Sequence, residues 1–236
     1  QMKDLAVGDK ILTGSGKYTD VYAFGHYEPN KTTNFLQIYT QQHKAPLEIT
    51  GDHLVYVKGE RNPTRADSTR VGDILQDGSS AGDGATITKI STVQRTGLYA
   101  PLTSDGTLLV DGIHASAYIS LQHNNAKEFV KLQNGISAMS FHDGIHAFLA
   151  PFRMLCMSLP SNSIAGTAVC QSYDSNGMPH FVGRGIQLAQ WLDSLDLNLY
   201  VQLILLSIAV LLLGPIYMFE SVMFSGSVGS FVAALG

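Results

Sequence analysis

Thr50 and His53 stand three residues apart, directly before the apolar run Leu54-Val55. An imidazole can donate a proton near neutral pH, and cleavage of an amide requires protonation of the departing nitrogen. A hydroxyl group three residues earlier can hold that amide by a hydrogen bond. The pair therefore fits amide chemistry, but a single Thr or His with this spacing is more often a structural or solvated residue.

His142 and His146 are a second pair that could do chemistry, since residues four apart share one face of a helix. With Asp143 beside them they invite a metal-site hypothesis. Only two such ligands are visible, however, and Gly144 weakens a helix. A structural role is therefore favoured, and the sequence predicts neither a metal site nor a cofactor. The histidines without a partner pattern, such as His114, are expected at the surface.

Two features concern covalent modification. Asn30-Lys31-Thr32 is an N-glycosylation sequon, usable if this part of the chain enters the secretory pathway, although such triplets are frequent by chance. Cys156 and Cys170 are too few for a disulfide framework and lack the clustered spacing of a structural zinc site. They either form one bridge or stay free.

The elements that must position Thr50 and His53 are strands. Residues 1–122 show no helical period, and apolar or alternating runs such as Phe35-Leu36-Gln37-Ile38-Tyr39 are separated by Gly, Asp, Asn and Pro. Short β-branched and aromatic runs at regular spacing predict an all-β domain.

The strands contain an internal repeat. Val7-Gly8-Asp9-Lys10-Ile11-Leu12 returns 64 residues later as Val71-Gly72-Asp73-Ile74-Leu75. Ala45-Pro46-Leu47, followed by Thr50-Gly51-Asp52-His53-Leu54, is echoed by Ala100-Pro101-Leu102 and Ser104-Asp105-Gly106-Thr107-Leu108. Two correspondences in the same order predict a duplicated, pseudo-twofold β unit, although Gly-Asp turns are common. Asp9 and Asp73 are interpreted as turn residues and not as catalytic carboxylates.

Charged side chains are concentrated in the first part of the chain, where residues 1–153 carry 29 of the 34 and residues 154–236 only five. Residues 199–219 carry none and match the ~20 residues that span a bilayer. They are predicted to form a transmembrane helix, after a linker at 154–198 and before an apolar tail at 220–236; a soluble core helix is the alternative. The net charge of −4 offers no basic surface for nucleic acid, so no nucleic-acid partner is expected.

Taken in order, five segments resemble consecutive motifs of the autoprocessing domain of hedgehog proteins. They are residues 2–12, 47–57 with Thr50 and His53, 97–111, 115–118 (Ala-Ser-Ala-Tyr) and 142–153 (His-Asp-Gly-Ile-His-Ala-Phe-Leu-Ala-Pro-Phe-Arg). That domain is the Hog form of the Hint domain, which inteins share. The resemblance implies an all-β, pseudo-twofold Hint domain at 1–122, followed by a helical connector at 123–153.

The resemblance also implies a protein that cuts itself. In the family, a cysteine that opens the domain attacks the preceding carbonyl, an N-to-S acyl shift replaces the amide with a thioester, and a second nucleophile releases the N-terminal part. Thr50 and His53 match the family's residues that bind and protonate the scissile amide. The partner is therefore the precursor's own N-terminal segment, in cis. The matching cysteine is expected upstream of Gln1, so this chain alone is expected to be inert.

The acceptor of the thioester depends on His26. This residue aligns with the Asp that activates the cholesterol hydroxyl in sterol-transferring hedgehogs, and an imidazole differs from a carboxylate in charge and geometry. His26 is expected to act as a base for water or another nucleophile, with an ordinary loop histidine as the alternative.

Hydrolysis, or another acceptor, is thus the favoured outcome. Transfer to a sterol or other lipid, and a degenerate Hint scaffold serving as a membrane-tethered interaction module, are the rival hypotheses. The expected location is a membrane of the secretory pathway, in the endoplasmic reticulum lumen or at the cell surface.

Overall fold

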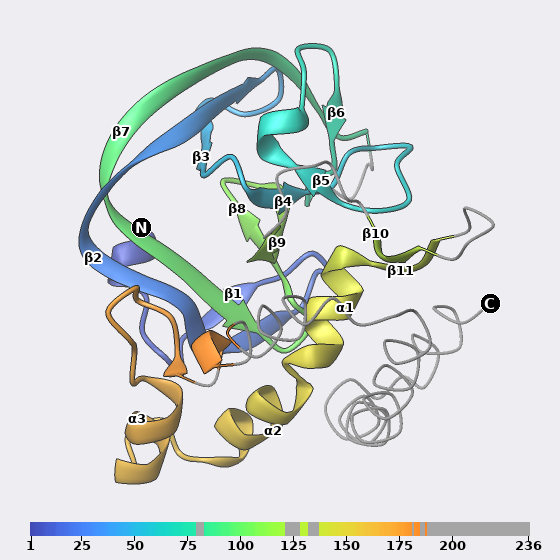
Figure 1. Cartoon of the computed structure of the whole chain (residues 1–236). Helices are drawn as coiled ribbons and strands as arrows, with labels where there is room; N and C mark the ends of the chain where they lie inside the picture. Colours follow the sequence, from blue (N-terminus) through green and yellow to red (C-terminus); the bar gives the residue numbers. More distant parts are fainter. Residues whose placement is uncertain (79–82, 121–127, 132–136, 181, 185–186, 188–236) are drawn as a thin grey trace.

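The computed structural model describes residues 1–78, 83–120, 128–131, 137–180, 182–184 and 187 (Figure 1). Its frame is a pair of long antiparallel strands, β2 (Tyr18–Thr40) and β7 (Ala85–Thr103). They stay paired along almost their whole length and curve together around the smaller strands in Figure 1. This curved pair forms the centre of the first of two sheets.

The first sheet has the order β1-β2-β7-β6, with β3 also paired to β2. The second sheet has the order β5-β4-β9-β8. The added strands are β1 (Lys10–Leu12), β3 (Leu47–Ile49), β4 (His53–Val55), β5 (Thr64–Arg65), β6 (Ile74–Leu75), β8 (Thr107–Val110) and β9 (Ile113–Ile119). Apart from two single-turn 3-10 helices, the regular secondary structure in the described part of residues 1–122 is therefore β, as predicted.

The predicted internal repeat is visible as two turns that are built alike. Each follows a short 3-10 helix, and these are η1 (Met2–Asp4) and η2 (Ala66–Ser68). Asp9 and Asp73 each accept, through Oδ2, a hydrogen bond of 2.8 Å from the backbone nitrogen three residues earlier. Gly8 and Gly72 have φ angles of +99° and +97°, in the left-handed region that favours glycine. Asp9 and Asp73 are thus turn residues, as predicted.

Two apolar clusters fill the molecule. One surrounds β3 and β4 and consists of Ile38, Leu47, Ile49, Val55, Ala66, Leu75, Ala85, Ile87, Ile113 and Ala115. The other joins strands to helices and consists of Tyr22, Ala23, Leu102, Leu108, Ala117, Tyr118, Leu149, Phe152, Cys156 and Cys170. Burial of one large apolar side chain contributes about 1.5–3 kcal/mol. Because Ile49 and Val55 are both buried, the short segment between them is anchored at each end.

Among the described residues, a hairpin and then helices follow the β domain. The hairpin pairs β10 (Glu128–Lys131) with β11 (Ser137–Ser140), and the helices are α1 (Phe141–Phe148), α2 (Ala150–Ser158) and α3 (Ile164–Cys170). The connector at 123–153 is predicted to be helical. Its described residues form the strands β10 and β11 first, and helix begins only with α1. The helix starts where Ser140 Oγ caps α1 by accepting a 3.0 Å hydrogen bond from the Asp143 nitrogen.

The segment predicted as a linker at 154–198 contains the end of α2 and all of α3. A disulfide joins Cys156 to Cys170, which decides between a bridge and free thiols. Phe152 of α2 packs edge-on against Tyr22 of β2 with ring centroids 6.1 Å apart, so the helices belong to the body of the fold.

The predicted transmembrane helix at 199–219 and apolar tail at 220–236 lie outside the described residues. Within the described ranges, no helix has both the length and the apolar character needed to cross a bilayer.

Candidate active site

Thr50 and His53 lie in the turn that carries the chain from β3 in the first sheet to β4 in the second. The backbone nitrogen of His53 donates to the Thr50 carbonyl oxygen at 3.2 Å, which closes the turn. Their side chains meet, with Thr50 Oγ1 2.7 Å from His53 Nδ1. The structure thus places the two predicted residues in direct contact, half-buried at the junction of the sheets.

The hydrogen bonds assign the protons of this pair. Thr50 Oγ1 donates its only proton to Asp52 Oδ1 at 2.5 Å, so His53 Nδ1 must be the donor to Thr50. The second nitrogen of the neutral ring, Nε2, is then unprotonated. Burial lowers the pKa of His53, an effect that the Asp52 charge opposes and the His26 ring strengthens. His53 is therefore a neutral imidazole that can accept a proton at Nε2.

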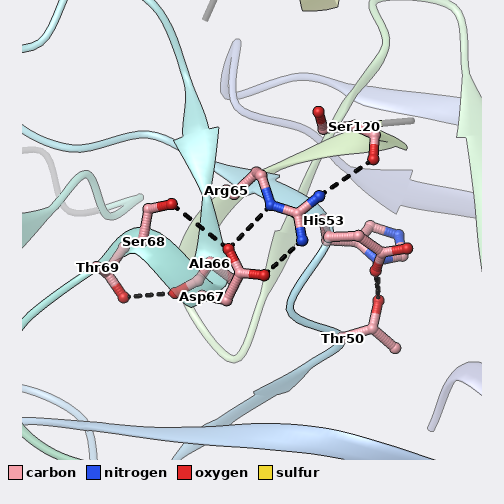
Figure 2. A network of polar contacts seen from close by, with 9 residues as sticks. Thr50, His53, Arg65, Ala66, Asp67, Ser68, Thr69 and Ser120 are labelled. Carbon is pink, nitrogen blue, oxygen red and sulfur yellow. Dashed lines mark hydrogen bonds and ion pairs between the residues drawn. The ribbon is translucent and has the colours of Figure 1, made fainter. Parts of the chain in front are cut away.

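Arg65 and Asp67 brace the turn from the second sheet (Figure 2). The Asp67 backbone nitrogen donates to the Gly51 carbonyl oxygen at 3.0 Å, and the Ser120 backbone nitrogen donates to the Asp52 carbonyl oxygen at 2.8 Å. Arg65 joins the two supports, since its Nε donates to Asp67 Oδ1 at 2.9 Å and its Nη1 to the Ser120 carbonyl oxygen at 3.3 Å. Sequence reasoning missed these contacts because they join segments that are far apart in the chain and leave no local spacing signal.

Thr50 and His53 line a cavity of about 90 Å³. Its other walls come mainly from β3, β7, β8 and β9, and include Met2, Phe35, Leu47, Glu48, Ile49, Gly97, Leu98, Tyr99, Ala100, Pro101, Leu108, Val110, Ala115, Ser116 and Ala117. Most of these side chains are apolar. The Thr50–His53 pair is thus a polar element in a largely apolar recess.

His26 lies on β2, opposite Ala100 of β7, and lines a second cavity of about 90 Å³. The two cavities share Ala100 and Ala117 as walls. The second cavity is strongly apolar, with Leu102, Ile119, Ile145, Phe148, Leu149, Met178 and Val182 among its lining residues. His26 is therefore near the Thr50–His53 pair but faces a separate space.

Glu28 is a site residue that sequence reasoning missed. Its Oε2 lies 2.5 Å from His26 Nε2, and this hydrogen bond is the largest cause of the lowered pKa of Glu28. The other ring nitrogen of His26, Nδ1, has no hydrogen-bond partner among the residues that the structure describes. The available signal was the spacing, because side chains two apart on a strand share one face. A histidine oriented by a carboxylate is suited to act as a base.

His142 and His146 stack with ring centroids 6.0 Å apart beneath the β domain. His142 Nδ1 lies 2.9 Å from Ser116 Oγ, and His146 Nδ1 lies 2.7 Å from the Tyr118 hydroxyl. Arg153 Nη1 also donates to His146 Nδ1 at 3.3 Å, so that nitrogen is an acceptor in a neutral ring. Burial is the main cause that lowers the pKa of His142 to about 4 and that of His146 well below its ordinary value. This is a structural arrangement of neutral rings.

The described residues hold no group of three or more His, Cys, Asp or Glu side chains that could bind a metal ion.

The expectation that His114 lies at the surface is wrong. His114 is half-buried, stacks on Tyr56 with centroids 4.0 Å apart, and has a pKa lowered by burial.

The chain matches the family model of the Hint module over residues 1–192. It is 33% identical over 131 residues to Warthog protein 1 of Caenorhabditis elegans, covering 52% of this chain and 27% of that protein. It is 29% identical over 135 residues to Tiggy-winkle hedgehog protein of Danio rerio, covering 52% of this chain and 32% of that protein. The chain thus spans a third or less of the length of these relatives.

Among solved structures, the MchDnaB-1 intein aligns with a TM-score of 0.40 and 16% identity, over 49% of this chain and 88% of the intein, and no conclusion rests on that likeness. The Hint module match extends over most of the chain, and hedgehog and Warthog proteins are among its relatives. The chain belongs to the Hint module family and is a Hint domain of the hedgehog type.

Proposed function

We propose that this chain is the autoprocessing part of a hedgehog-like precursor and that it cleaves the peptide bond at the start of its own domain. The observation that carries the proposal is the contact between Thr50 Oγ1 and His53 Nδ1, which leaves His53 Nε2 free beside a cavity. The substrate is the precursor's own N-terminal segment, and the nucleophile is a cysteine thiol at the start of the complete domain.

His53 moves the proton in the first step. Nε2 takes the thiol proton, the thiolate attacks the scissile carbonyl carbon, and a C–S bond forms. The protonated ring then gives this proton to the scissile nitrogen, so the C–N bond breaks and leaves a thioester and a free amine. Proton transfer by a positioned side chain contributes about 10²- to 10⁴-fold to a rate. Thr50 Oγ1, whose own proton is held by Asp52, offers a lone pair to the scissile N–H.

His26 acts in the second step. Nδ1 takes a proton from the acceptor, whose oxygen attacks the thioester carbon, and the C–S bond breaks. The thiolate then recovers the proton from the ring. Water as the acceptor gives a free carboxylate on the released fragment. The hydrogen bond from His26 Nε2 to Glu28 holds the ring for this role.

A lipid alcohol is the second candidate acceptor. The observation that favours it is the apolar lining of the cavity beside His26, to which α1 contributes Ile145 and Phe148. The uncharged run at 199–219 supports the same alternative, since membrane attachment would bring the domain to such an acceptor. The product would be an ester in place of a carboxylate.

The test is cleavage of a precursor that carries this chain behind its native upstream residues. We expect two fragments on a denaturing gel, faster release with added thiol, and a rate about 10²- to 10⁴-fold lower for His53→Ala. Thr50→Val should be slow and Thr50→Ser should be close to wild type. His180→Ala, at an exposed histidine, is the matched control and should cleave normally.

An intact wild-type precursor in the presence of thiol would refute the proposal and favour the scaffold hypothesis. Wild-type cleavage by His53→Ala would refute the assigned role of His53. Mass spectrometry of the fragment released without added thiol separates the acceptors: a free carboxylate excludes lipid transfer, whereas an ester excludes hydrolysis.

A further inference from the structure

β2 contains a bulge in its pairing with β7. Its pairing with β7 shifts between Glu28 opposite Leu98 and Thr32 opposite Thr96, so residues 29–31 oppose one residue of β7. Pro29 lacks the backbone N–H that a regular ladder would require, and an extra residue in one strand locally disrupts the ladder. The four residues 29–32 are all exposed.

The bulge and its first paired residue, Thr32, contain the triplet Asn30-Lys31-Thr32. This is the only Asn-x-Ser/Thr triplet in the sequence in which x is not proline, because Pro63 disqualifies Asn62-Pro63-Thr64. We propose that Asn30 is an N-linked glycosylation site. The ligand class is an oligosaccharide attached covalently to the side-chain amide.

The geometry leaves the acceptor group accessible. No hydrogen bond engages the Asn30 amide within the described residues, whereas its neighbours are held: Lys31 Nζ lies 3.5 Å from Glu28 Oε1, and Thr32 Oγ1 lies 3.0 Å from Thr96 Oγ1. Both contacts are made by side chains that follow Asn30 in the chain, and neither covers the Asn30 amide. A bulky glycan at this position would point to solvent and would displace no core residue.

The buried disulfide supplies an independent argument about the compartment. Cys156 and Cys170 are 6% and 2% exposed and are joined in the second apolar cluster. Disulfides form and persist in oxidising compartments such as the endoplasmic reticulum lumen. Asn-x-Ser/Thr triplets are glycosylated in secreted proteins, so a chain that forms this disulfide there also meets the glycosylation machinery.

The transfer needs one co-reactant, a lipid pyrophosphate-linked oligosaccharide. The amide nitrogen of Asn30 attacks the anomeric carbon of the sugar and a C–N bond forms. The anomeric C–O bond breaks, the lipid pyrophosphate leaves as an anion, and the amide nitrogen loses one proton to solvent.

The experiment uses the complete precursor, directed to the secretory pathway of eukaryotic cells, and treatment with an amidase that removes N-linked glycans. We expect the wild type to move faster on a gel after treatment, and peptide mapping in heavy-oxygen water to find residue 30 converted to labelled Asp. Asn30→Gln and Thr32→Ala should show no shift. Thr32→Ser keeps the sequon and should still shift, and Asn62→Gln is the matched control that should behave as wild type.

The state of the disulfide makes a negative result decisive. If alkylation finds Cys156 and Cys170 joined while the enzyme leaves mobility unchanged, the chain has reached the oxidising lumen without modification and the proposal is overturned. Two free cysteines together with unchanged mobility also overturn it, because the chain has then neither been modified nor matured in the required compartment. Neither outcome depends on self-cleavage, so this test stands apart from that of the proposed function.

Discussion

The backbone nitrogen of Asp67 donates to the carbonyl oxygen of Gly51 at 3.0 Å, and the Asp67 side chain fills the space above that glycine. A Cβ atom at residue 51 would lie 3.1 Å from Asp67 Cβ. Gly51 is the second residue of the turn that joins Thr50 to His53. The position of the candidate catalytic turn is therefore set by the 3-10 helix η2, whose Asp67 carboxylate Arg65 holds.

Asp67→Asn should slow self-cleavage about tenfold while the domain remains folded, because small misplacements of a catalytic group are costly. The substitution keeps the size of the side chain but removes the charge that fixes Arg65. The measurement is the first-order rate of precursor cleavage beside thermal unfolding. Asp20→Asn, which breaks the exposed ion pair with Lys10, is the control and should cleave normally. Equal rates for both variants would contradict the role of the brace.

Glu28→Gln should slow the second step and leave the first intact, because Glu28 orients His26 but does not touch Thr50 or His53. The test compares cleavage with and without a small thiol, which loses its proton to the buffer, attacks the thioester as a thiolate and so needs no base from the protein. We expect a slow reaction without thiol and a wild-type rate with it. Lys31→Gln removes the ammonium group that contacts the other carboxylate oxygen of Glu28 and should have little effect. A defect that thiol fails to rescue would place Glu28 in the first step.

The features predictable from the sequence are those that short-range chemistry determines. The turns at Gly8 and Gly72 follow from residues within three positions of each other, and so does the contact of Thr50 with His53. The brace between Asp67 and Gly51 and the bond between Ser116 and His142 join distant segments, and no local pattern marks them. The half-buried position of His114 was missed for the same reason, because its stacking partner Tyr56 is distant in the sequence.

Acid should destabilise the domain through His142. Burial is the main cause of its folded-state pKa of about 4, below the ordinary value of 6.5, whereas the nearby Asp143 charge opposes the shift. Between these values the unfolded chain binds more protons. The stabilisation is therefore complete above about pH 6.5 and is lost as the pH falls toward 4, a loss on the order of 3 kcal/mol.

Thermal unfolding between about pH 7.5 and pH 5 measures this loss. We expect the melting temperature to fall with pH in the wild type and in His180→Gln, an exposed control. His142→Gln keeps a polar group near Ser116 but does not titrate, so its melting temperature should depend less on pH. An equally steep dependence in His142→Gln would exclude this histidine as the cause.

The disulfide should stabilise the fold without serving the chemistry. Cys156 and Cys170 are separated by 14 residues, and closing a loop of that length is worth about 3 kcal/mol. The double variant Cys156→Ala, Cys170→Ala should therefore melt about 6–12 °C below the oxidised wild type. Reductant should lower the melting temperature of the wild type and leave that of the variant unchanged.

Cleavage by the same variant should proceed at the wild-type rate below its melting temperature, because neither α2 nor α3 lines the cavity beside Thr50 and His53. The helices instead contact the far part of β2 through Phe152 and Tyr22. The rate should be measured without thiol, since thiol would both reduce the wild type and resolve the thioester. A variant with the wild-type melting temperature would contradict the stabilising role of the disulfide. A variant that is folded but cleaves slowly would show that the disulfide also serves the cleavage reaction.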